Sequence, residues 1–243
     1  MNGFMSVFKR ELKSYFSTPL AYVFIVVFLW FCGYKTFQRD FFKMRQASMQ
    51  VFFSTIPDMF SILVPAIAMR LWSEERRSNS IELLFSLPIT TTQAVLGKFF
   101  AAWSVLLLAL ALTFPMVITV NYLGDPDLGP IITGYTGSLL LAGAFLATGS
   151  FFSALTRNQI IALVLGVLFC FAFLYVDSPS FMSTMSIVAP IGFVEAMASL
   201  SLQARFEGML QGVIEMRNLL YFILLIAGWL WANIILLEER RAA

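Results

Sequence analysis

Few side chains in this sequence of 243 residues could take part in catalysis or metal binding. It contains no histidine, and its two cysteines, Cys32 and Cys170, both lie in apolar stretches. The lack of histidine excludes histidine metal sites, Ser-His or Cys-His catalysis and histidine proton relays. The cysteines have neither zinc-site nor disulfide-framework spacing. The sequence therefore predicts no metal site and no cofactor bound by this chain, and its function must be sought where the apolar sequence is interrupted.

Two short segments, 122–125 and 175–177, each carry a tyrosine followed by an aspartate. Paired aspartates that share a proton are the catalytic groups of aspartic proteases, and an intramembrane protease would place them inside the bilayer. Here both acids fall at predicted outer edges of membrane spans, with Pro126 and Pro179 close by, a pattern typical of loops. The pattern therefore argues against a protease dyad.

Asp58 is the one acid inside a predicted span, and it has two interpretations. An intramembrane carboxylate is a candidate functional group by default. Alternatively, Pro57 and Asp58 open a helix, with proline at its first position and the acid favoured by the helix dipole. We favour this cap at the outer surface and keep the intramembrane acid as the alternative.

The composition of the chain indicates what kind of elements position these residues. Hydrophobic residues make up 59% of the chain and charged residues 12%, with a mean hydropathy of +0.83. Soluble domains carry about 25% charged residues, so a water-soluble globular protein is excluded. The 16 basic and 14 acidic residues leave a net charge of +2, which gives no electrostatic case for nucleic acid. We expect an all-α integral membrane protein.

Charge-free runs of the roughly 20 residues that cross a bilayer predict the spans. Five runs are long enough, and a sixth is accepted although it includes Asp58. We expect one transmembrane domain over residues 1–243, with spans at about 20–37, 51–71, 98–121, 131–155, 159–176 and 218–237. A further apolar run at 178–194 contains two prolines and is expected to be re-entrant or interfacial.

Six spans place both termini on one side, and most lysines and arginines fall on that side. The positive-inside rule therefore favours cytoplasmic termini. Before the first span, apolar residues at helical spacing and cations on the other face predict an interfacial helix at 4–17. The residues expected at the membrane interface are Phe8, Lys9, Arg10, Lys13 and Tyr15.

Residues 70–98 form the one sizeable cytoplasmic loop. Asn79 with Glu82 resembles a capping box, and Pro88 ends the helix that follows, which predicts a short helix at about 79–87. Its apolar face carries Ile81, Leu84 and Phe85. This face either lies on the membrane or fills a groove on a soluble partner. A second cap, Thr90 with Gln93, predicts the start of the next helix.

Three of these segments together resemble a known family: KRELKSYFSTPLAYV at 9–23, WSEERR at 72–77 and IELLFSLP at 81–88. They are similar to ABC-2 type transporter permeases, most of all to the gliding-motility-associated (GldF-type) branch, with NosY-type permeases as neighbours. The resemblance is specific over about the first 100 residues. Beyond them the likeness extends only to the number and spacing of spans.

The resemblance implies a six-helix permease, of type V exporter-like architecture, that pairs with a second copy or a paralogue. It also implies two separate ABC ATPase subunits that hold ATP and Mg, an outer helical excursion at about 178–215, and an N-terminal connecting helix. The loop between the second and third spans would be the coupling helix that sits in a cleft of the ATPase. This role would fall to Glu74, Glu75, Arg76, Arg77, Glu82, Leu83 and Leu84, beside the apolar-face residues Ile81 and Phe85.

The residues themselves agree that this chain binds no nucleotide, because Gly97-Lys98 lacks the upstream glycine of a phosphate-binding loop. We therefore expect a non-enzymatic permease of the bacterial inner membrane that couples ATP hydrolysis on a partner to export or force transmission. A protein with a large periplasmic domain is a further candidate partner. The alternative is a secondary transporter or channel, although the chain lacks the repeats and multiple intramembrane charges that ion coupling uses.

Overall fold

The computed structural model describes residues 3–38, 48–78, 88–188 and 190–242. Within these ranges the regular structure is entirely α-helical, which confirms the expected fold class. The helices are α1 (Gly3–Ser17), α2 (Leu20–Gln38), α3 (Gln50–Ala68), α4 (Arg70–Arg77), α6 (Thr91–Ala111), α7 (Phe114–Leu123), α8 (Leu128–Leu155), α9 (Gln159–Tyr175), α10 (Pro179–Val188), α11 (Ile191–Ala198), α12 (Leu202–Met209) and α13 (Met216–Ala242). The predicted coupling helix at about 79–87 lies outside the described residues.

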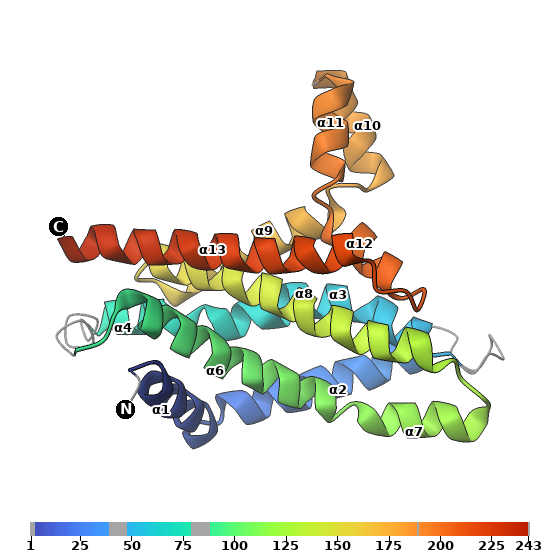
Figure 1. The fold of residues 1–243 in the computed structure, drawn as a ribbon, viewed down its shortest axis with the longest axis horizontal. Helices are drawn as coiled ribbons and strands as arrows, with labels where there is room; N and C mark the ends of the chain where they lie inside the picture. Colours follow the sequence, from blue (N-terminus) through green and yellow to red (C-terminus); the bar gives the residue numbers. More distant parts are fainter. Residues whose placement is uncertain (1–2, 39–47, 79–87, 189, 243) are drawn as a thin grey trace.

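The long helices run along one axis of the molecule, and both chain ends lie at the same end of the bundle (Figure 1). Among the described residues, five helical stretches are long and apolar enough to span a membrane: α2, α3 with α4, α6 with α7, α8, and α13. A sixth is present only if α9 and α10 count as one span, and these two helices meet at 90°. Each of the six expected spans therefore has a helix at its position.

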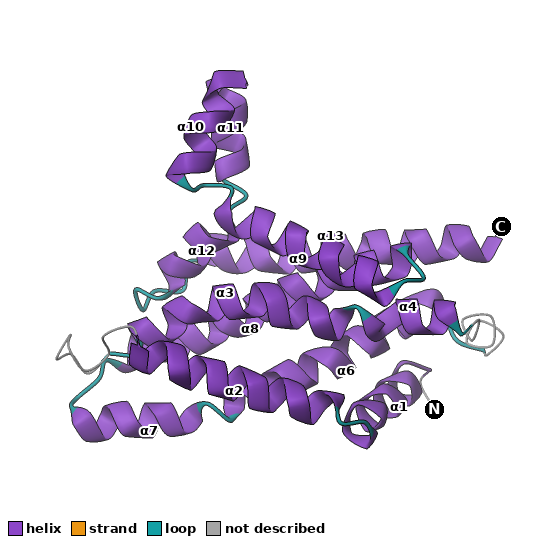
Figure 2. Cartoon of the chain, turned by 180° about the vertical axis from the view of Figure 1, so that it is seen from behind, coloured by secondary structure: helices purple, strands orange, loops and turns teal. Residues whose placement is uncertain are grey.

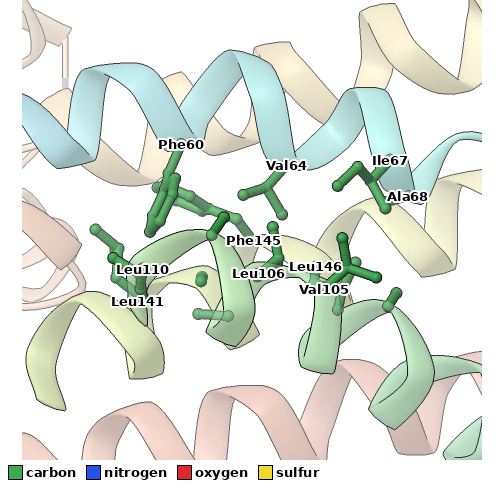
Figure 3. Close-up of a cluster of buried hydrophobic side chains, with 14 of the residues drawn as sticks. Phe60, Val64, Ile67, Ala68, Val105, Leu106, Leu110, Leu141, Phe145 and Leu146 are labelled. Atoms are coloured by element: carbon green, nitrogen blue, oxygen red, sulfur yellow. The ribbon is translucent and has the colours of Figure 1, made fainter. Parts of the chain in front are cut away.

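The core lies where α3, α6 and α8 meet (Figure 3). Phe60 and Val64 of α3 face Leu106 of α6 and Phe145 of α8, and all four side chains are fully buried. Gly149 of α8 lets α3 approach closely, because a Cβ there would stand 2.6 Å from the Cβ of Ala68. Small residues on α8 thus allow close packing between helices of this chain. Such packing is needed because the hydrophobic effect does not drive helices together inside a bilayer.

The N-terminal helix α1 lies across the first half of α6 instead of joining the bundle lengthwise (Figure 1). Gly97 makes this crossing close, since a Cβ there would stand 2.8 Å from the side chain of Val7. The start of α6 is the capping box expected from the sequence: the Thr90 hydroxyl accepts from the Gln93 amide, and the Gln93 side chain accepts from the Thr90 amide.

Helices α10 and α11 form a hairpin that projects sideways from the bundle, at a right angle to α9 (Figure 2). Helix α12 then returns to pack against α8 and α9, and α13 runs back to the end of the bundle where the chain begins. The segment that we expected to be re-entrant or interfacial is therefore two short helices, and neither is long enough to cross a bilayer.

Candidate functional site

Helix α4 continues α3 after a break at Met69, and a side chain of α8 caps the N-terminus of α4. Met69 offers no side-chain cap, so the first amides of α4 need another acceptor. The Ser153 hydroxyl of α8 accepts from the amides of Trp72 at 3.0 Å and Ser73 at 3.1 Å, and donates to the Met69 carbonyl at 2.7 Å. One buried serine thus fixes the start of α4 to α8.

A second buried contact joins α4 to both α8 and α13. The Trp72 indole is fully buried, and its Nε1 donates to the Ser150 hydroxyl at 3.3 Å. The amide of Asn233, on α13, donates to the same hydroxyl at 2.8 Å. Because polar groups inside a bundle need partners from neighbouring helices, this contact sets the rotation of α4 against two membrane helices.

The other side of α4 meets a buried lysine. Lys98 of α6 is only 3% exposed, and its ammonium lies 2.9 Å from the Glu75 carboxylate and 3.2 Å from that of Glu11. Arg10 adds a second cation, 2.7 Å from Glu11 and 3.5 Å from Glu75. We call these four residues the charged junction. It ties α1, α4 and α6 together at the end of the bundle where the chain begins (Figure 1).

The charged junction satisfies a lysine that could not stay charged alone in an apolar setting. Two carboxylates surround the ammonium, and the Trp72 ring lies 5.2 Å from it, close enough for a cation–π contact. Burial alone would raise the pKa of Glu11, but Lys98 and Arg10 outweigh it and hold that pKa below its ordinary value. Glu11 is therefore charged at neutral pH, as the junction requires.

Of the five charged residues expected to couple to the ATPase, the four on α4 point in different directions. Glu74 pairs with Arg70 at 2.8 Å within α4, and Glu75 belongs to the charged junction. Arg76 donates to the Ala154 carbonyl at the end of α8, where Arg240 also donates to Leu155. Cations there complement the helix dipole. Arg77 is exposed. Ile81, Glu82, Leu83, Leu84 and Phe85 lie outside the described residues.

The residues expected at the membrane interface divide between two faces of α1. Lys9 and Lys13 are exposed, Phe8 is half-buried, and Tyr15 packs in the core with 8% of its surface exposed. Burial raises the pKa of Tyr15, and the nearby Glu11 carboxylate adds to the effect. Arg10 is half-exposed and reaches back to the charged junction.

The favoured interpretation of Asp58 as a helix cap is wrong. Helix α3 begins at Gln50, so Pro57 and Asp58 lie inside it, two turns from its start. Proline is tolerated inside membrane helices because neighbouring groups compensate for the lost hydrogen bond. The Asp58 carboxylate accepts a 2.5 Å hydrogen bond from the Tyr175 hydroxyl, at the end of α9. Asp58 is therefore an acid within a candidate span, and it joins α3 to α9.

Sequence reasoning missed two members of the charged junction, Glu11 and Lys98. Glu11 lies within the expected interfacial helix at 4–17 and Lys98 at the start of the third expected span, and neither is among the expected site residues. The available signal was Gly97-Lys98 two turns inside the helix that begins at Thr91, where a lysine needs an acidic partner once it is buried. Nothing in the spacing identified that partner.

Within the described residues, no group of three histidine, cysteine, aspartate or glutamate side chains could hold a metal ion. No protein of curated function matches the chain. The profile of a family described as "ABC-2 family transporter protein" matches residues 5–236, almost the whole chain. Members are non-catalytic membrane subunits that act with ABC ATPases, and the ATPases bind the ATP, so the permease carries no cofactor.

That membership decides between the two functions left open above, in favour of an ATP-driven transporter over a secondary transporter or channel. The likeness covers the last spans as well as the first 100 residues that carried the resemblance. The chain therefore belongs to the ABC-2 family, as a multi-pass transporter permease.

Proposed function

We propose that the partner ATPase moves this permease through the segment 74–85, and that α4, whose last turn forms the first part of this segment, carries the motion into the bundle. The single observation that supports this most is the charged junction. Lys98 sits at the start of a span, and it is paired with a residue of α4 and a residue of α1. A displacement of α4 would break a buried ion pair unless all three helices moved together.

The contacts of α4 with the bundle give the predicted coupling residues two different roles. Glu75 and Arg76 bind their own chain, which suits residues that transmit motion better than residues that contact the ATPase. Arg77 and the following segment, with Ile81, Glu82, Leu83, Leu84 and Phe85, would make the contact itself. An ATPase can bias the spans only through physical contact that differs between its states.

The orientation of the chain is part of the proposal. Both termini lie at the end of the bundle that carries α4, and the positive-inside rule assigns this end to the cytoplasm (Figure 1). On this orientation the exposed Lys9 and Lys13 of α1 would face anionic headgroups, with α1 in the plane of the membrane.

We also propose the finer assignment from the three resembling segments: a permease of the GldF-type branch, near the NosY type, in the bacterial inner membrane. It would work with two ATPase subunits and a second permease copy or a paralogue, and a protein with a large periplasmic domain would complete the assembly. The complex would drive export or transmit force, and measurements of solute flux separate these two outcomes.

Co-purification from the native membrane tests the coupling surface. Tagged wild-type protein should retain an ATPase, and Leu84→Asp should lose it, because a charge in an apolar helix-in-groove contact is strongly unfavourable. Leu123→Asp makes the same change at the exposed far end of α7 and should keep the ATPase. If L84D retains the ATPase with unchanged ATP turnover, the coupling surface is elsewhere.

A further inference from the structure

A basic hollow lies at the end of the bundle that holds both chain termini, apart from the charged junction. It measures about 500 Å³ and is lined by Arg77, Arg157, Asn158, Gln159 and Ile160. Its walls come from the end of α4 and from the turn between α8 and α9. No acidic side chain is among these lining residues. Among the described residues, the lining of the hollow therefore carries positive charge and no acidic counter-ion.

Two more arginines add to this charge. Arg240 and Arg157 both repel Arg76 electrostatically, so the four arginines form one cluster around the ends of α4, α8 and α13. Arg76 and Arg240 are held by the last carbonyls of α8. Arg77 and Arg157 are exposed, and neither forms an ion pair with any residue in the part of the chain that the structure describes.

Among the described residues, the acids closest in sequence do not neutralise the arginine cluster. Glu74 is engaged by Arg70, and Glu75 by Lys98. Glu238 and Glu239 precede Arg240 on α13, but neither lines the hollow. Clustered like charges destabilise a fold unless an anion compensates them. The geometry thus favours an anionic ligand with several acceptor oxygens, which arginine recognises by paired hydrogen bonds.

An apolar surface continues from the hollow along α9. Ile160 lines the hollow itself and is 70% exposed. Ile161, Val164 and Leu168 follow at helical spacing, and each is about half exposed. A soluble anion or an acidic protein surface would not bind to this apolar surface. An amphiphile would, because its charged group can lie among the arginines while its hydrocarbon chain covers the helix.

We propose that the hollow binds the phosphate of an anionic phospholipid, whose acyl chains lie along the exposed apolar face of α9. Basic pockets between membrane helices are suited to such headgroups. The N-terminus of α9 adds partial positive charge at the same place. That this lipid belongs to the cytoplasmic leaflet rests on the orientation given under Proposed function. The proposal that the hollow binds the lipid does not depend on that orientation.

Native mass spectrometry of the purified permease, with whatever subunits it retains, tests the site. Wild-type protein titrated with phosphatidylglycerol and with phosphatidylcholine should prefer the anionic lipid. Arg77→Gln with Arg157→Gln should weaken phosphatidylglycerol binding about 30-fold, from the contribution of each basic side chain near an anionic headgroup. Lys35→Gln with Arg217→Gln removes the same charge at the opposite end and should leave binding unchanged.

Three results would overturn the proposal. The first is equal binding of phosphatidylglycerol by the R77Q/R157Q variant and the wild type. The second is displacement of the lipid by excess inorganic phosphate, which would make the hollow a site for soluble anions. The third is loss of the ATPase from R77Q/R157Q with lipid binding intact, which would show that Arg77 serves the ATPase contact proposed above and that neither arginine binds the lipid. The last result leaves the coupling proposal standing, and L84D tests that proposal independently.

Discussion

The Lys98 ammonium lies 2.9 Å from the Glu75 carboxylate, although the two residues belong to different helices and the lysine is 3% exposed. Such a buried pair contributes little net stability compared with apolar residues of the same shape, but losing one partner is costly. The pair therefore fixes one relative position of α4 and α6 and opposes others. A fixed position of α4 against α6 suits the proposed role of α4, which must stay attached to the bundle through each cycle of the partner ATPase.

Lys98→Met should destabilise the protein by up to about 3–5 kcal/mol, because two largely buried carboxylates lose the buried ammonium and keep only the half-exposed Arg10 as a cation. Denaturant titration of the purified protein in mixed micelles measures the loss. The triple variant E11Q/E75Q/K98M removes the stranded charges as well and should recover most of it. If K98M and the triple variant are equally unstable, the cost comes from lost packing and not from charge.

Acid should weaken the charged junction through Glu11. Its pKa is held below the ordinary value of 4.5, so the folded protein binds this proton less readily than the unfolded chain does. The stabilisation is complete well above pH 4.5, begins to fall near that pH, and is lost as the pH drops through the lowered value. Stability measured against pH should show this loss in wild-type protein and a flatter profile in Glu11→Gln. Glu239→Gln, at the exposed end of α13, should keep the wild-type profile.

Ser153→Ala should cost about 1–3 kcal/mol, because two buried amides of α4 lose their acceptor. The comparison is Ser138→Ala, since Ser138 is equally buried but its hydroxyl bonds a carbonyl one turn earlier in its own helix. Thermal unfolding in detergent should rank S153A well below S138A. Equal midpoints would show that the start of α4 does not depend on this cap.

The sequence predicts the helices well because each charge is costly in a bilayer, so the charge-free runs mark the spans directly. The capping box at Thr90 is local and equally readable. The partners of Lys98 could not be predicted, because ion pairs between helices follow no sequence period. Asp58 was misread because proline next to an acid is typical of a helix start, and the preceding two turns of α3 carry no signal against it.

The hydrogen bond between Tyr175 and Asp58 should be measurable as a coupling between α3 and α9. Asp58→Ala and Tyr175→Phe should each cost about 1–2 kcal/mol, since each removes one partner of a charge-assisted hydrogen bond between partly exposed groups. Because the two changes remove the same bond, the double variant should cost less than their sum. A double-mutant cycle of unfolding free energies checks this. Additive costs would mean that each side chain acts through other contacts and that the bond does not hold α9 to α3.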